Sequence, residues 1–518
     1  MPDLLLGIDV GTSAVKSGIF DLDGRLLGIA RSPYRTSAPH PGWAECDPEL
    51  WWRGFVKSLD AACDKAGVKA GRIGAVGVDV LYPAVMPLDA AGRALHPAIL
   101  YCDQRSILQV KAIEAKIPRE EYQSIIGNTL VPGNCAVTSL LWLRDERPKE
   151  FTSARTIGFA STFVTSRLTG EFFADPSMAA LSGLVDIRDP WLWSDNLCGI
   201  LGIDAARLPR IAGAAEVIGT VTEAAAKATG LKPGTPVVCG CGDAPACALG
   251  AGALSPGTVV YIAGSTDCVA VPMRSATQDR RWVNSAYIPR GVWMGIGTTT
   301  SSGMSVEWFV REILGSGKEA IQQMTALAAS SPPGSRRVLY LPYLQGERTP
   351  VWDPMARGMF IGLTSTTTLA DMARAVFEGT AFALRQVIEC LRNVLREEVG
   401  EIMAVGGATA NDLWNTIKAS ALKRRLHVLS FQETGALGAA LLAGIGAGHY
   451  KSFEDALAVA RSVGGGRIVE PDQQAAAVYD ELFPVYSSLY PRTRDIAHAL
   501  ACKRPEEGTT ASKEQRQP

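Results

Sequence analysis

Asp9 stands between an apolar run and a turn of small residues, an arrangement suited to binding phosphate. Residues 4–6 predict a buried strand, and residues 15–20 predict a returning strand. The turn between them offers backbone N–H groups and hydroxyls without bulky side chains, and a nearby carboxylate can hold Mg²⁺ through water. We therefore predict a phosphate and Mg²⁺ site formed by Asp9, Gly11, Thr12, Ser13 and Lys16. The alternative is an ordinary hairpin with polar turn residues.

A second acid, Asp243, follows the apolar run PVVCGCG and precedes the stretch APACALGAG, which predicts a helix rich in small residues. An acid held at a strand end above a cleft can accept the proton of a hydroxyl whose oxygen attacks the γ-phosphorus of ATP. Asp243 is therefore our predicted general base, and we also expect it to contact the metal beside Asp9. The structural alternative is an N-cap of the following helix, which excludes neither role.

The pattern of strand, small-residue turn and strand returns at residues 259–271, in VVYIAGSTDCVAV. Two such hairpins suggest an internal duplication. We expect the turn Gly264, Ser265 and Thr266 to lie opposite the first turn and to help hold a triphosphate. Asp267 follows directly, and its charge would repel phosphate unless the side chain points away or meets the metal.

Five stretches spread over most of the chain resemble a known family. They are GIDVGTSAVK near the start, PGWAECDPELWW at 41–52, GCGDAPACALGAG at 240–252, LPYLQGERTPVWDPMARGMFIGLT at 341–364 and VGGATANDLWNTIKAS at 405–420. The chain resembles the sugar kinases of the FGGY family, and the fourth stretch is close to that family's signature. The resemblance implies an α/β fold in which two actin-like (ribonuclease H-like) domains flank a nucleotide cleft, with ATP and Mg²⁺ as cofactors.

The resemblance also assigns roles to residues away from the two turns. Asp103 and Arg105 match a W-x-D-x-R element whose acid binds sugar hydroxyls in the family. Without the family match, such a pair would be a surface ion pair of little energetic consequence. Small residues after a strand let a nucleotide approach the backbone. The nucleotide contacts implied by the match are Gly406, Gly407, Asn411 and Asn415.

The expected acceptor pocket departs from the pattern of the family's xylulose kinases. Those relatives carry Gln-Met-His-Gly after the strand that here is IGAVGVDV, where this chain has Leu81, Tyr82, Pro83 and Ala84. Pro83 cannot supply the hydrogen bond of a histidine, and Met178 stands where relatives often place an acid. We expect Leu81, Tyr82 and Pro83 to contact a sugar or polyol that is smaller or less hydroxylated than D-xylulose. The alternative is that Tyr82 or a water replaces the lost contact, in which case D-xylulose stays a candidate substrate.

The amino-acid composition argues against some classes of binding partner but does not by itself indicate a function. The chain has 51 basic and 52 acidic residues and no basic block, so nothing in it indicates binding to nucleic acid or to an anionic membrane. No apolar run reaches the roughly 18 to 20 residues of a membrane helix, and no signal-peptide pattern is present. We therefore expect a cytoplasmic protein whose eleven cysteines are mostly reduced. Cys239 and Cys241 are expected to share one face of a strand as plain buried residues.

The 518 residues exceed one ordinary hydrophobic core. We expect a sugar-binding domain with the catalytic base at 1–254, a nucleotide-binding domain at 255–492 and a disordered tail at 503–518. The helix predicted at 434–448 is interpreted as packing between elements. The resemblance is compatible with a homodimer, although no residue demonstrates one.

Together these features predict in-line transfer of the γ-phosphoryl group of MgATP to a hydroxyl of a small sugar or polyol. The actin-like fold also serves ATPases that bind protein partners, so the fold alone does not establish kinase activity. The alternatives from other classes are such an ATPase and a non-catalytic sugar sensor.

Overall fold

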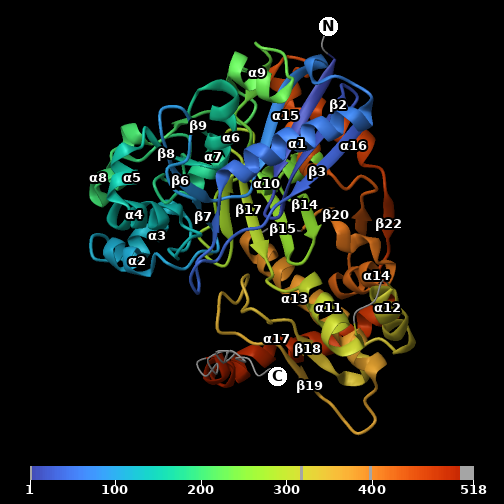
Figure 1. Cartoon of the computed structure of the whole chain (residues 1–518). Helices are drawn as coiled ribbons and strands as arrows, with labels where there is room; N and C mark the ends of the chain where they lie inside the picture. The colour runs from blue at the N-terminus through green and yellow to red at the C-terminus, as the bar shows by residue number, and fades with distance from the viewer. Residues whose placement is uncertain (1–2, 316–318, 396–398, 502–518) are drawn as a thin grey trace, which may run out of the picture.

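Two mixed β-sheets lie at the centre of the molecule, and helices cover them (Figure 1). The computed structural model describes residues 3–315, 319–395 and 399–501. Within these residues, the first half of the chain builds one seven-stranded sheet and the second half builds the other. The α/β class predicted from the sequence is confirmed.

The first sheet has the strand order β11-β12-β5-β1-β2-β3, with β13 also paired to β5. Its strands are β1 Leu4–Val10, β2 Ala14–Asp21, β3 Leu26–Pro33, β5 Ile73–Val80, β11 Val217–Thr220, β12 Pro236–Val238 and β13 Cys241–Gly242. β1 is antiparallel to β2 and parallel to β5. In this register Asp9 stands opposite Lys16 on one side and Asp79 on the other, so three charged residues occupy one row at the end of the sheet.

The second sheet has the strand order β16-β17-β15-β14-β20-β21-β22. Its strands are β14 Val259–Ala263, β15 Asp267–Met273, β16 Val283–Ala286, β17 Trp293–Thr298, β20 Ile402–Val405, β21 Leu426–Val428 and β22 Arg467–Val469. β14 is antiparallel to β15 and parallel to β20, just as β1 is to β2 and β5. The shared topology confirms the predicted internal duplication, with the turn at 264–266 equivalent to the turn at 11–13.

Helix α1 (Pro48–Ala66) covers the first sheet and begins where the sequence predicts. Asp47 caps it by accepting the N–H of Glu49 at 3.0 Å, and Trp51 and Phe55 are fully buried on its core face. The remaining helices of the first half are α2 Ile107–Glu114, α3 Arg119–Ile126, α4 Ala136–Glu146, α5 Pro148–Ser153, α6 Ala160–Thr169, α7 Pro176–Ala180, α8 Asp195–Leu201, α9 Glu223–Thr229 and α10 Asp243–Gly250.

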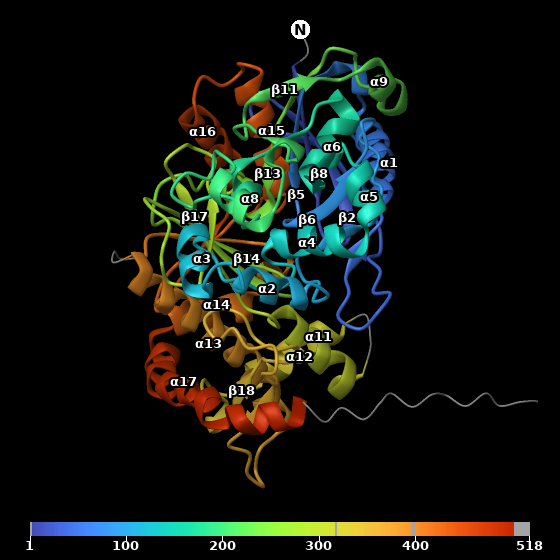
Figure 2. The ribbon, with the colours of Figure 1, turned by 90° about the vertical axis from the view of Figure 1, so that its left-hand side faces the viewer.

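Smaller sheets and further helices complete the two halves. Strands β4 Glu45–Cys46, β7 Ala98–Leu100, β6 Ala84–Leu88 and β8 Thr156–Phe159 pair in that order, β9 Phe173–Ala174 pairs with β10 Arg210–Ile211, and β18 Leu339–Leu341 pairs with β19 Met359–Ile361. The helices of the second half are α11 Gly303–Phe309, α12 Ala320–Ser330, α13 Leu369–Leu395, α14 Asp412–Leu422, α15 Thr434–Gly446, α16 Phe453–Gly464 and α17 Gln473–Ala501. Figure 2 shows α11, α12, α13 and α17 below the first-half elements.

Helix α15 belongs to the second half of the sequence but packs on the first sheet (Figures 1 and 2). Glycines make this close approach feasible: a Cβ built on Gly7 would lie 1.8 Å from the carbonyl oxygen of Ala436, and one on Gly77 would lie 1.9 Å from that of Ala439. The helix is a packing element, as expected, and its N-terminus also reaches the central cavity described below. A division of the chain at 254/255 therefore does not separate the two packed bodies completely.

Some local expectations need revision. The predicted strand PVVCGC is interrupted because Gly240 adopts a φ of +77°, so β12 ends at Val238 and β13 begins at Cys241. Cys239 and Cys241 therefore do not share a continuous strand, although both are buried and free. The predicted tail at 503–518 lies outside the described residues. In the part of the chain that is described, no helix is both long and apolar enough to span a membrane.

Candidate active site

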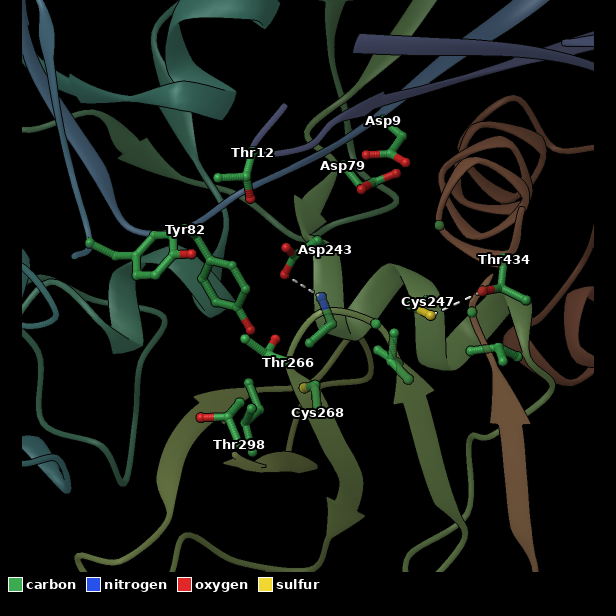
Figure 3. Close-up of a pocket in the computed structure, with 18 of the residues that line it drawn as sticks. Asp9, Thr12, Asp79, Tyr82, Asp243, Cys247, Thr266, Cys268, Thr298 and Thr434 are labelled. Atoms are coloured by element: carbon green, nitrogen blue, oxygen red, sulfur yellow. Dashed lines mark hydrogen bonds between the residues drawn. The ribbon is translucent and has the colours of Figure 1, made fainter. Parts of the chain in front are cut away.

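A cavity of about 450 Å³ opens where the strand ends and turns of the two sheets meet (Figure 3). The first half lines it with Asp9, Thr12, Lys16, Asp79, Tyr82, Tyr101, Asn134, Leu181, Asp243, Ala244 and Cys247, and the second half with Ile262, Gly264, Thr266, Cys268, Val283, Ile296, Thr298, Arg348, Trp352, Val405, Gly406, Gln432, Glu433, Thr434 and Gly435. Residues from both turns predicted to hold phosphate thus face one cavity.

Asp243 is the first residue of α10, and its side chain is exposed to the cavity. One carboxylate oxygen accepts the N–H of Ala244 at 2.7 Å (Figure 3). The enclosed position in the cleft and the negative charge of Asp9 raise the pKa of Asp243 to about 7. Gly242, not Asp243, holds the N-cap position of α10, so the structural alternative does not account for this side chain.

Lys16 is held between two acids. Its Nζ lies 3.2 Å from Oδ2 of Asp9 and 2.9 Å from Oε2 of Glu433. These charges hold the pKa of Lys16 well above its usual range despite its partial burial. Gly11 and Ser13 belong to the turn beside Lys16 but do not line the cavity. Gly11 donates its N–H to the carbonyl oxygen of Ala14, and the carbonyl oxygen of Ser13 accepts the N–H of Tyr34.

The second turn is braced by backbone hydrogen bonds from the start of α11. Gly303 and Met304 donate their N–H groups to the carbonyl oxygens of Gly264 and Ser265 at 3.1 and 3.0 Å. Gly264 and Thr266 line the central cavity. The turn therefore presents small groups to the cavity on a fixed backbone.

Asp267 does not line the cavity, so its carboxylate is not directed at a bound phosphate. Its side chain is 1% exposed and lies 3.6 Å from Nζ of Lys418, which is equally buried. Lys418 also donates to the hydroxyl of Tyr261 and lies 3.7 Å from the centre of the Trp414 ring. Burial lowers the pKa of Lys418 to about 8, although Asp267 opposes that shift.

A second cavity of about 780 Å³ shares Gly264 with the first. Ser265, Gly407 and Asn411 line it, together with apolar side chains of α11, α12 and α14. Asn411 caps α14 by accepting the N–H of Trp414 at 3.0 Å, and its amide donates to the Thr325 hydroxyl at 2.8 Å. Asn415 lies behind this wall, where it is buried and donates to the carbonyl oxygen of Thr409 at 2.7 Å.

Tyr82 lines the central cavity on the side of Asp243 (Figure 3). Its ring packs against the backbone before Asp243, because a Cβ built on Gly242 would lie 2.4 Å from Cε1 of Tyr82. The Tyr82 hydroxyl is buried and forms no hydrogen bond of ordinary distance and angle in the protein, although Ser285 lies close enough to influence its pKa. Leu81 and Pro83 are buried beside it and do not line the cavity.

Asp103 and Arg105 form a buried pair outside the cavity lining. The Asp103 carboxylate accepts the N–H of Ala44 at 2.6 Å and bonds from the Arg105 guanidinium at 2.8 and 2.9 Å. The guanidinium carbon lies 3.6 Å from the centre of the Trp43 ring and 4.7 Å from that of Trp142. The pair is therefore not the surface ion pair considered above, and its side chains brace the wall made by β4 and β7.

Several lining residues were not singled out from the sequence. They are Asp79, Tyr101, Asn134, Thr298, Arg348, Trp352, Gln432, Glu433 and Thr434. A signal existed for Asp79, because an acid inside the otherwise apolar strand IGAVGVDV is a buried charge with no local partner. Arg348 and Trp352 lie within the signature stretch at 341–364, but nothing in their spacing shows which side chains face the cavity.

The acids of the cavity suit a hydrated cation. Among the described residues, no group of three or more His, Cys, Asp and Glu side chains is arranged to hold a metal ion by itself. Mg²⁺ keeps several waters and takes one or two protein carboxylates together with substrate phosphates. Both carboxylate oxygens of Asp79 are buried without a partner next to Asp9, so these two residues fit such an ion.

Comparison with known proteins agrees with this geometry. The N-terminal domain model of the FGGY family of carbohydrate kinases matches residues 4–250, and the C-terminal domain model matches residues 259–447. The chain is similar to the xylulose kinase of Bacillus subtilis (strain 168), with 27% identity over 498 residues, 96% of this chain and 98% of that protein. It is 30% identical to the xylulose kinase of Escherichia coli (strain K12) over 460 residues, 88% of this chain and 92% of that protein. The crystal structure of xylulose kinase from Rhodospirillum rubrum matches with a TM-score of 0.87 at 30% identity, covering 96% of this chain and 100% of that one.

Two duplicated α/β halves around a cleft, with acids and small-residue turns that face one cavity, are the arrangement of the fold shared by sugar kinases and actin-like ATPases. The chain belongs to the FGGY family of carbohydrate kinases, whose two domain models match most of its length. It is an ATP-dependent carbohydrate kinase, and the resemblance seen in the sequence is confirmed.

Proposed function

We propose that this kinase transfers the γ-phosphoryl group of ATP to a hydroxyl of a small sugar or polyol, with Asp243 as the general base. The observation that carries the proposal is the placement of Asp243, whose carboxylate is open to the cavity shared by the two turns. The one hydrogen bond from Ala244 orients the side chain and leaves an oxygen for an incoming hydroxyl. An acid with a pKa near neutrality suits proton transfer at physiological pH.

In the proposed reaction, the acceptor oxygen forms a bond to the γ-phosphorus while its proton passes to Asp243. The bond from the γ-phosphorus to the β–γ bridging oxygen breaks, and ADP leaves with that electron pair. Thr12, Lys16, Gly264 and Thr266 are the groups of the cavity that stabilise charge on the phosphates. Mg²⁺, when bound, neutralises phosphate charge, and Asp9 holds it through water.

The second cavity is the proposed site of the adenosine. It adjoins the central cavity at Gly264, and Gly407 leaves open space because no atom lies within 4 Å of a Cβ built there. The apolar side chains of Val306 and Ile321 suit a flat base. Asn411 borders this space as a polar contact, whereas Asn415 supports the wall through Thr409.

The acceptor side favours a small substrate. Tyr82 fills space next to Asp243, and Leu181, Val283 and Ile296 make much of the remaining wall apolar. An apolar wall leaves a buried sugar hydroxyl unpaired, at a cost of about 1 to 3 kcal/mol. We therefore propose an acceptor that is smaller or less hydroxylated than D-xylulose. D-xylulose remains the alternative because the unpartnered hydroxyl of Tyr82 can pair with a sugar hydroxyl.

The test is a coupled assay of ADP release across ketopentoses, tetritols, hexitols, glycerol and related polyols. The proposal expects acceptor-dependent ADP release and a kcat/KM for D-xylulose below that of the best acceptor. If D-xylulose leads the panel by about tenfold or more, the specificity assigned from Tyr82, Pro83 and Met178 is wrong while the kinase activity stands.

A further inference from the structure

Asp79 carries a buried carboxylate that the proposed mechanism leaves without a task. Asp79 lies near the end of β5 and is 0% exposed. Neither of its carboxylate oxygens has a hydrogen-bond partner in the protein. A buried acid without partners costs several kcal/mol when charged. Such a group in a functional cavity points to a positive ligand that the protein alone does not supply.

The neighbours of Asp79 define where that ligand would lie. Asp79 is the direct register partner of Asp9 across the parallel pair of β5 and β1. A Cβ built on Gly435 would lie 3.5 Å from Oδ2 of Asp79 and 3.7 Å from Oδ2 of Asp9, so both carboxylates face the same spot beside the first turn of α15. Figure 3 shows the two carboxylates adjacent to each other above Asp243.

Protein groups close by do not already neutralise Asp79. Lys16 forms ion pairs with Asp9 and Glu433, and no ion pair joins it to Asp79 among the described residues. The N-terminus of α15 faces the two acids and offers a partial positive charge, but no N–H of that helix bonds either Asp79 oxygen. Among the described residues, these neighbours therefore supply neither an ion pair nor a hydrogen bond to the Asp79 carboxylate.

The second sheet shows that the fold does not need acids here. The residue equivalent to Asp9 is Ile262, two positions before its turn, and the register partner of Ile262 on β20 is Val405. Both line the same cavity from the opposite side. An apolar pair thus fills the same two sheet positions in one half, and an acidic pair fills them in the other.

We propose that Asp79 and Asp9 jointly hold the hydrated divalent cation that accompanies the nucleotide, with Asp79 acting through the water shell as a metal-positioning residue. This inference rests on the proposed function, because the phosphates supply the remaining ligands. A small, strongly hydrated cation of the Mg²⁺ or Mn²⁺ type suits two carboxylates separated by ordered water. Asp79 thereby helps to fix the cation over the Asp9 side of the cleft, away from the base.

The test measures binding of Mn²⁺ and ADP without turnover. Mn²⁺ affinity of the ADP complex is followed by electron paramagnetic resonance, and ADP affinity without metal by calorimetry. Asp79→Asn should weaken Mn²⁺ binding by about tenfold or more and Asp79→Ala by more than that, while metal-free ADP binding stays unchanged. The Mg²⁺·ADP-induced rise in melting temperature should shrink in both variants, and the metal-free melting temperature of Asp79→Asn should not fall.

Glu347→Gln is the matched control. Glu347 is also buried and acidic with one unpartnered oxygen, but it faces Thr300 and Arg348 in the second half of the chain. It should keep Mn²⁺ affinity within about twofold of wild type, because it lies outside the proposed ligand set. If Glu347→Gln lost as much Mn²⁺ affinity as Asp79→Asn, the loss would follow from removing any buried negative charge, and the role assigned to Asp79 would be wrong.

If the wild-type protein binds ADP and Mn²⁺ and the Asp79→Asn variant binds Mn²⁺ with the same affinity, the inference about Asp79 is wrong and the proposed function stands. Wild-type protein that binds neither ADP nor Mn²⁺·ADP would overturn the proposed function as well. If the variants do not fold, a crystal structure of the wild-type Mn²⁺·ADP complex decides the question. The ion is expected within about 5 Å of an Asp79 oxygen, one water away, and a greater separation contradicts the proposal.

Discussion

The two hairpins of the duplicated fold use acidic residues in opposite ways. In the first, Asp9 precedes the turn at 11–13 and lines the cavity opposite Lys16. In the second, Asp267 follows the turn at 264–266 and is buried against Lys418, while Ile262 takes the place equivalent to Asp9. Because successive residues of a strand point to opposite faces, a shift of the acid along the hairpin changes its side and its role.

Because of this difference, the two halves of the chain contribute different kinds of groups to the cleft. The first half contributes the acids Asp9, Asp79 and Asp243, which suit metal and proton chemistry. The second half contributes a braced turn and the larger cavity, which suit the nucleotide. The same backbone plan therefore supports reactive charge on one wall and binding on the other.

The largest expected effect is on the acid assigned to proton transfer. Asp243→Asn keeps size and polarity but removes the proton acceptor, so kcat should fall by roughly 10² to 10⁴-fold. ADP affinity should change little, because Asp243 does not line the second cavity, which is the proposed site of the adenosine. Steady-state kinetics with the best acceptor and ADP calorimetry check both points. A variant that retains near-normal turnover would remove Asp243 from the mechanism.

A contrasting effect is expected at the buried acid of the second hairpin. Asp267→Ala leaves the Lys418 ammonium unpaired at a site where both side chains are 1% exposed. Loss of one partner of a buried ion pair costs about 3 to 5 kcal/mol of unfolding free energy. Urea unfolding measures this cost, and the further change Lys418→Met should recover much of it. Unchanged stability in the single variant would show that the pair contributes no net stabilisation.

The cavity-lining acid of the first hairpin, Asp9, should behave differently from Asp267. Asp9→Ala and Lys16→Ala should reduce kcat/KM for ATP by about tenfold to a hundredfold and should alter the Mg²⁺ dependence, because both residues act on phosphate charge. Acceptor binding and the unfolding free energy should change little. Wild-type ATP and Mg²⁺ dependence in each variant would mean that the phosphate site has been assigned to the wrong turn.

A smaller effect is expected on the acceptor wall. The hydroxyl of Tyr82 is buried without a partner beside Asp243, so it is available to a substrate hydroxyl. Tyr82→Phe should lower kcat/KM for the acceptor by about tenfold and leave the KM for ATP unchanged. Acceptor titrations at saturating ATP measure the change. An unaltered acceptor kcat/KM would exclude a hydrogen bond from this hydroxyl.

The sequence predicted features that depend on local pattern. The strand and turn of Asp9, the start of α1 at Pro48 and the duplicated hairpin at 259–271 all appear where the residue types place them. The interruption at Gly240 was missed because a run of apolar and small residues does not show which glycine adopts a positive φ.

Features that depend on distant segments were harder to predict. Lys16 stands opposite Asp9 within one hairpin, but Asp79 joins this row only because β5, which is distant in sequence, pairs with β1. Likewise, Thr434 and Gly435 reach the cavity because α15 crosses to the first sheet over glycines. Asp103 was predicted to contact sugar from a family motif, and its saturation by Arg105 and Ala44 is visible only once the fold is known.

The proposed function requires the cleft to transfer the γ-phosphoryl group to an acceptor hydroxyl instead of to water. The most direct measurement is a single-turnover reaction with ATP labelled at the γ-phosphorus, in the presence and absence of the best acceptor from the panel. We expect label on the acceptor, with one ADP formed for each labelled product and little free phosphate. Label released as inorganic phosphate at the same rate with or without acceptor would contradict it and would indicate an ATPase of the same fold.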